Sequence, residues 1–139
     1  MPVPPEYSRA TDQFYEFLLD TRDTSGLSST HQAYTMTQGV LQAFRRRLNI
    51  KDAILFASVL PVGLRALFVA DWDINEPKRQ FEDRSTMTKE VQSLRPEHNF
   101  VPETAIRDVA RVLRKHVDEG ALNLVLARLS EGAVEFWER

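Results

Sequence analysis

Apolar residues recur every three or four positions through most of the chain, which is the pattern of helices with one buried face. The first such stretch is 12–23, where Thr11 or Asp12 could cap the helix. A longer stretch ends near Asn49, and its apolar positions are Ala33, Met36, Val40, Leu41, Phe44 and Leu48. The sequence therefore predicts two helices here, separated by a Ser- and Thr-rich loop over 24–28.

The segment over 53–70 is apolar almost throughout and contains a single charge, Arg65. It is about the minimum length for crossing a bilayer, but an arginine inside a membrane costs roughly 2.5–3.5 kcal/mol. We therefore expect two short buried helices that meet at Pro61 rather than a membrane span. Further helices are predicted over 85–94 and from Pro102 onward.

The apolar pattern of the first half returns 69 residues later. The positions Ile106, Val109, Ala110, Leu113 and Val117 follow Thr37, Val40, Leu41, Phe44 and Leu48 in the same register. Because the alternation typical of strands is absent, we predict an all-α fold, a compact helical bundle built from two similar halves. An extended arm over 1–11, whose prolines disfavour a helix, precedes one helical domain over 12–139, with halves at about 12–70 and 85–139 joined by the loop 71–84.

Composition narrows the class of protein without identifying it. The chain has 139 residues, 42% of them apolar, no cysteine and a formal net charge of −2. A core of ordinary size fits this composition, whereas disulfides, thiolate metal sites and a cysteine nucleophile are excluded. The negative charge disfavours binding to nucleic acid or to a membrane surface, and the start lacks the features of a secretory signal. We therefore expect a cytoplasmic protein.

Several segments of the chain are similar to a known family. They are 33–34 (AY), 40–48 (VLQAFRRRL), 60–61 (LP), 64–68 (LRALF) and 72–73 (WD), with echoes at 112–117 (VLRKHV) and 136–137 (FW). In this order, from Phe14 onward, they resemble the bacterial proteins grouped as domain of unknown function 2267. Val59, Ala66 and Ser130 depart from the residues that are usual in the family. The resemblance implies a small bacterial helical domain and no particular activity.

The loop after the first half contains most of a calcium-binding pattern. Asp71, Asp73, Asn75 and Glu82 stand where an EF-hand loop places oxygen ligands. The sixth position requires a sharp turn, but it holds Glu76, and Pro77 pushes that residue toward extended geometry. We therefore interpret the segment as a polar connecting loop without Ca²⁺. The histidines, His31, His98 and His116, show no metal-ligand spacing, and we expect no metal or cofactor.

Two groups of arginines have different predicted roles. The run 45–47 ends a helix, and Arg114 and Lys115 occupy equivalent positions in the second half. Cations are favoured near a helix C-terminus, so we interpret these residues as a solvated helix end rather than a nucleic-acid site. Arg65 interrupts an apolar segment, so we expect it to be more than half buried and paired with a carboxylate or with backbone carbonyls.

Function is only weakly indicated, because no phosphate-binding loop and no hydrolase nucleophile motif occurs. We favour a non-enzymatic protein-binding or scaffold module, which could form homodimers. The alternatives are a small-molecule or metal-dependent enzyme with a site between the halves and, third, a nucleic-acid binder using a basic helix face. The candidate ligand or partner contacts are Tyr34, Arg45, Arg65, Trp72 and Arg114, and no catalytic residue is predicted. A pocket of converging ionisable groups would favour the enzyme, and an exposed apolar patch would favour the module.

Overall fold

Helices supply all the regular structure in the computed structural model, which describes residues 3–94 and 100–139. Within those ranges there are nine helices and no strand, so the all-α prediction is confirmed. The helices are α1 (Pro5–Ser8), α2 (Ala10–Ser25), α3 (Thr30–Arg45), α4 (Ile50–Ala57), α5 (Val62–Val69), α6 (Arg84–Ser93), α7 (Ala105–His116), α8 (Glu119–Arg128) and α9 (Glu131–Phe136). None of the helices described is long and apolar enough to cross a membrane.

Polar side chains begin several of these helices. Ser29 accepts a hydrogen bond from a backbone N–H in the first turn of α3, and Asn49, Asp83 and Asp118 do the same for α4, α6 and α8. These side chains satisfy N–H groups that have no acceptor inside the helix. Because Asn49 caps α4, the preceding helix ends at Arg45, four residues before the predicted end.

The prediction of an extended arm over 1–11 is wrong from Pro5 onward. Pro5 begins the short helix α1, and α2 starts at Ala10. A proline is compatible with the first helical turn because the N–H that it lacks would have no helical acceptor there. Neither Thr11 nor Asp12 caps α2, because both already lie inside that helix.

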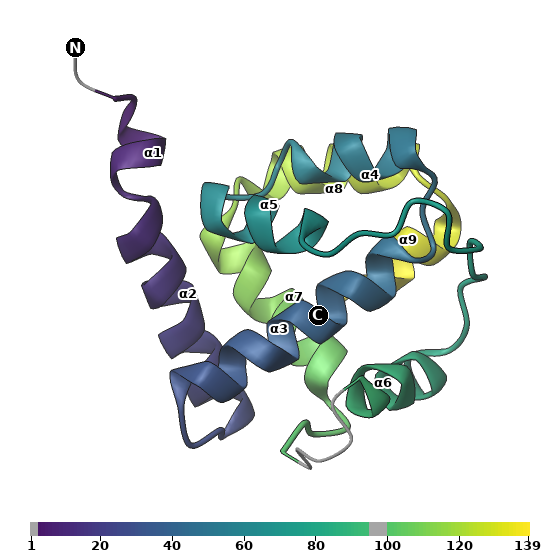
Figure 1. Cartoon of the computed structure of the whole chain (residues 1–139), viewed down its shortest axis with the longest axis horizontal. Coiled ribbons are helices and arrows are strands. Elements are labelled where there is room, and N and C mark those ends of the chain that lie inside the picture. The colour runs from purple at the N-terminus through teal and green to yellow at the C-terminus, as the bar shows by residue number, and fades with distance from the viewer. Residues whose placement is uncertain (1–2, 95–99) are drawn as a thin grey trace.

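The helices are arranged around a central pair, α3 and α7, which contact each other (Figure 1). The long helix α2 packs against both members of this pair, and α6 lies on the other side of α3. The short helices α4 and α8 lie side by side across one end of the bundle. This arrangement brings α2 and α5 together, and Ile54 of α4 and Val69 of α5 remain exposed.

An aromatic cluster occupies the centre of the core. Phe44, Phe56, Phe136 and Trp137 are completely buried. Neighbouring ring centroids among these four residues lie between 4.7 and 5.5 Å apart, a range typical of favourable aromatic pairs. The rings come from α3, α4 and the end of α9, so the C-terminal residues complete a core that the first half begins.

The arginine run 45–47, at the end of α3 and just after it, was predicted to be solvated. That prediction is wrong for two of these residues. Arg45 and Arg47 are 4% and 2% exposed. The Arg47 Nη1 atom donates to a Glu90 carboxylate oxygen at 2.9 Å, and the guanidinium also donates to the carbonyl oxygens of Ala43 and Gln80. The second half of the chain therefore supplies the carboxylate that compensates a cation buried in the first half.

The ion pairs of Glu90 make the stability of the fold sensitive to acid. Burial acts to raise the pKa of this carboxyl, but Arg47, Arg79 and Arg46 outweigh burial and hold the pKa below its ordinary value of 4.5. A carboxyl whose pKa is lower in the folded state stabilises the fold above its unfolded pKa and loses that contribution as the pH falls through the folded value. We expect the free energy of unfolding to fall below about pH 4.5, and to fall less steeply in Glu90→Gln. Equal slopes for both proteins in urea unfolding at several pH values would contradict this role.

Candidate functional site

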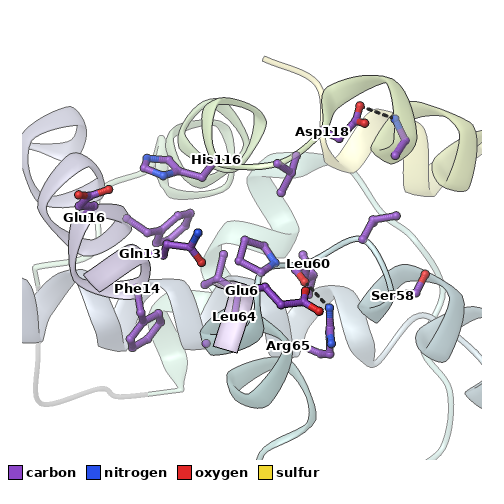
Figure 2. Close-up of a pocket in the computed structure, with 16 residues that line it drawn as sticks. Glu6, Gln13, Phe14, Glu16, Ser58, Leu60, Leu64, Arg65, His116 and Asp118 are labelled. Atoms are coloured by element: carbon purple, nitrogen blue, oxygen red, sulfur yellow. Dashed lines mark hydrogen bonds between the residues drawn. The ribbon is translucent and has the colours of Figure 1, made fainter. Parts of the chain in front are cut away.

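A cavity of about 510 Å³, here called the junction cavity, lies where α2 meets the α4–α5 and α7–α8 junctions (Figure 2). Its apolar lining includes Phe14, Phe17, Leu60 and Leu64. Its ionisable lining residues are Glu6, Glu16, Arg65, His116 and Asp118. The volume falls in the range of small-molecule sites, which combine apolar walls with a few polar groups.

Arg65 borders this cavity and is partly buried, as predicted. Its Nε atom donates to the Ala57 carbonyl oxygen at 3.2 Å, and its Nη2 atom donates to the Leu60 carbonyl oxygen at 3.0 Å. Ala57 is the last residue of α4, whose final carbonyls have no acceptor role within the helix ladder, and Leu60 lies in the connection to α5. The prediction that backbone carbonyls engage Arg65 is therefore confirmed, and the residue fixes the junction between α4 and α5.

Other polar groups around the junction cavity are also engaged by the fold. His116 Nε2 lies 3.0 Å from an Asp20 carboxylate oxygen, and the Asp118 carboxylate caps α8. The Ser58 hydroxyl donates to the Leu55 carbonyl oxygen at 2.6 Å. Because the hydroxyl and the imidazole face different partners, this geometry supports binding of a small molecule better than nucleophilic catalysis.

Among the candidate contact residues, the structure brings Arg45 and Trp72 together. The Arg45 guanidinium carbon lies 5.4 Å from the centroid of the Trp72 ring, a cation–π contact. Its Nη1 atom donates to the carbonyl oxygens of Phe68 and Ala70, both at 2.9 Å. Burial lowers the pKa of Arg45, and the neighbouring Arg46 charge lowers it further. Arg45 therefore fixes the end of α5 through these hydrogen bonds, and its guanidinium contacts one face of the Trp72 ring.

The remaining candidates lie elsewhere. Tyr34 stacks on His31, with ring centroids 6.1 Å apart. Arg114 donates from Nε to the Trp137 carbonyl oxygen at 2.9 Å, at the end of α9. Arg65 and Trp72 line one groove on the α4–α5 surface, and Tyr34 is not part of it. The structure therefore does not assemble Tyr34, Arg65 and Trp72 into one site.

The loop between the halves uses its acidic residues within the fold. Glu82 forms an ion pair with the buried Arg47 at 3.2 Å. The positive φ angle of the loop, 55°, falls on Asp71 rather than on Glu76, the sixth position of the calcium pattern. No group of three or more His, Asp or Glu side chains suited to a metal occurs among the residues described, and His98 lies outside them. The absence of Ca²⁺ binding by this loop stays a prediction.

A surface that the sequence reasoning missed runs along α4, the end of α5 and the following loop. Five neighbouring apolar residues form this surface, here called the docking strip: Ile50, Ile54, Val69, Trp72 and Ile74. Four of them are between 45% and 64% exposed, and Trp72 is partly buried. Trp72 lines one hollow with Ile54 and Val69 and a second hollow with Ile50 and Ile74, so the strip is continuous.

The docking strip corrects the expectation that the segment 53–70 is a purely buried pair of helices. One face of α4 packs into the core through Ala53 and Phe56, whereas Ile54 on the same helix is 64% exposed. A helix that is apolar on several faces offers more apolar surface than one core contact can bury. The surplus of apolar residues in the segment 53–70 was therefore the feature of the sequence that could have indicated an exposed apolar surface.

The comparison with known proteins covers most of the fold. Residues 14–136, from α2 to the end of α9, match a family described as "Uncharacterized conserved protein (DUF2267)". None of the curated proteins matches the sequence significantly. The family match agrees with the resemblance carried by the segments 40–48 and 64–68. The chain therefore belongs to the DUF2267 family of uncharacterised conserved proteins.

Proposed function

We propose that the protein is a non-enzymatic protein-binding module whose contact surface is the docking strip. The observation that carries this proposal is the continuity of exposed apolar side chains around Trp72. Single exposed apolar residues are normal on a protein surface, whereas a contiguous patch marks an interaction site. Tryptophan is among the residue types most enriched at the energetic centres of protein interfaces, and Trp72 lines both hollows of the strip.

We also propose that the two halves repeat one structural arrangement. Arg45 donates to the carbonyl oxygen of Phe68, and Arg114 donates to that of Trp137, with both residues shifted by the same 69 positions. The residues that cap α4 and α8 are separated by 69 positions as well. These matching contacts support a common register for the first and second halves.

With this register, residues of the docking strip can be compared with the residues at the equivalent positions of the second half. Ile50, Ile54 and Val69 correspond to Glu119, Asn123 and Glu138. The buried position Ala53, in contrast, corresponds to another buried apolar residue, Leu122. Because equivalent places in the second half hold polar residues, folding does not require apolar side chains there. The apolar residues of the first half therefore fit a docking role better than a structural one.

A small-molecule site in the junction cavity is the second candidate function. Its volume of about 510 Å³ suits a small organic ligand, and Arg65 and His116 both line it. It ranks second because both side chains already bond to groups within the fold. Nucleic-acid binding ranks last, because Arg45 and Arg114 direct their donors to backbone carbonyls.

Photo-crosslinking in living cells tests the proposed docking function. We expect p-benzoylphenylalanine at position 54 to form adducts with a partner protein, and Val69→Glu to reduce them by placing a charge beside the contact. Leu124 is the matched control position, because it is 72% exposed on α8 and is not part of the strip. Equal adduct yields at positions 54 and 124, or no adduct at position 54, would contradict the proposal.

A further inference from the structure

We infer that the partner at the docking strip is a second copy of this chain. This inference rests on the proposed function and adds the occupant of the surface. A two-fold interface pairs one patch with itself, so each protruding side chain needs a hollow on the same patch. Ile54 protrudes at 64% exposure beside a groove of about 470 Å³, whose lining includes Ala57, Val69 and Trp72. The strip therefore contains both the protrusion and the hollow that self-pairing requires.

The position of Ile54 on its helix suits such a pairing. The residue lies near the middle of α4 (Ile50–Ala57) and is exposed on its surface. A two-fold axis that passes beside Ile54 places the two copies of α4 antiparallel and lays each Ile54 over the groove of the other copy. Antiparallel helices also place the positive end of one helix dipole beside the negative end of the other.

The charges around the docking strip also favour a second copy over a strongly charged partner. The charged residues that line the two hollows of the strip are the cations Arg45, Arg46, Arg65 and Lys78 and the carboxylates Asp73 and Glu76, and Lys51, Asp52 and Asp71 are close to strip residues in the sequence. Arg46 and Glu76 already pair at 3.1 Å, and the remaining charges of both signs nearly balance, so the patch can face itself without strong net repulsion. In the antiparallel pair, Asp52 in the first turn of α4 comes to the end of the second copy's α4, where Arg65 lies against the Ala57 carbonyl.

Sedimentation velocity over a wide range of protein concentrations tests the inference. We expect the wild-type chain to pass from monomer to dimer as concentration rises. Ile54→Asn, which introduces the residue of the equivalent second-half position, should weaken association on the order of 100-fold because the contact is lost twice. Leu124→Asn changes an equally exposed residue outside the strip and should leave the association unchanged. Circular dichroism and melting temperature show whether each variant is folded.

Disulfide trapping adds a second measurement, because the chain contains no cysteine. Under mild oxidation, Ile54→Cys should form a covalent dimer much faster than Leu124→Cys. A wild-type chain that stays monomeric at every concentration, or a dimer that Ile54→Asn leaves intact, would overturn the inference. In that case, in-cell adducts of position 54 with a different protein would still support the docking function. A lack of adducts at that position would reject the docking function as well.

Discussion

Replacing Arg47 with alanine will lower the free energy of unfolding by about 3–5 kcal/mol, the range for removing one partner of a buried ion pair. The Arg47 side chain is fully covered, and Glu90 is almost covered. Loss of the guanidinium also leaves the carbonyl oxygens of Ala43 and Gln80 without this donor. A buried acceptor that loses its donor bears its desolvation cost without compensation.

The matched control for this prediction is Arg22→Ala. Arg22 forms an ion pair with Asp23 at 3.0 Å, but that pair is exposed to solvent. Exposed ion pairs contribute less than about 1 kcal/mol, so we expect Arg22→Ala to lower the free energy of unfolding only slightly. Urea unfolding monitored by circular dichroism gives both values. A loss for Arg47→Ala no greater than that for Arg22→Ala would show that the Arg47 network contributes little.

Truncation of Trp137 to alanine will have a comparable effect, a loss of about 3–5 kcal/mol. The indole is completely buried, and its ring centroid lies 5.1–5.5 Å from those of Phe44, Phe56 and Phe136. Its removal leaves a void among rings from three helices, and a core this tightly packed can only partly close it. Urea unfolding followed by far-ultraviolet circular dichroism measures the loss.

Trp137→Phe separates the role of the ring from that of its polar atom. The indole Nε1 atom is buried and has no hydrogen-bond partner among the described residues. Phenylalanine removes this unpaired donor and keeps most of the aromatic contact, so the loss of stability should be much smaller than for alanine. Equal losses for the two variants would mean that ring packing is not the source of the stabilisation.

The sequence predicts most of the helices well because they have a regular apolar period, whereas the short α1, which buries no residue, was not predicted. The predicted helix over 85–94 agrees with α6 (Arg84–Ser93) to within one residue at either end. The partial burial of Arg65 and its backbone partners also followed from the sequence, because a charge inside an apolar segment must find compensation. These predictions need only the spacing of apolar residues along the chain and the free-energy cost of burying a charge.

The roles of Arg45 and Arg47 could not be predicted in the same way. Both belong to one run of identical charges, and their partners lie far along the chain. Arg45 bonds to the carbonyl of Phe68, 23 residues away, and Arg47 bonds to Glu90, 43 residues away. Only the packing of α3 against α5 and α6 brings these groups together. Helix-end electrostatics therefore suggested solvated side chains where tertiary contacts bury them.

The docking strip could not be predicted from the sequence for a related reason. Ile54 and Ala53 are both apolar and adjacent in sequence, yet one is 64% exposed and the other 1% exposed. Which face of α4 becomes buried depends on the position of α8, with which it is in contact. Composition and periodicity cannot supply that position. The proposed repeat could have indicated it, because in that register Ile54 corresponds to the polar Asn123.

The most direct test of the docking surface places second-half residues into the first half. The variant carries Ile50→Glu, Ile54→Asn and Val69→Glu together, with p-benzoylphenylalanine at position 74 to report contacts at the strip in living cells. Because all three replaced side chains are exposed, we expect a melting temperature close to that of the parent chain. The account predicts that the adducts formed by the parent chain disappear in this variant. Adducts of undiminished yield from a folded variant would contradict it.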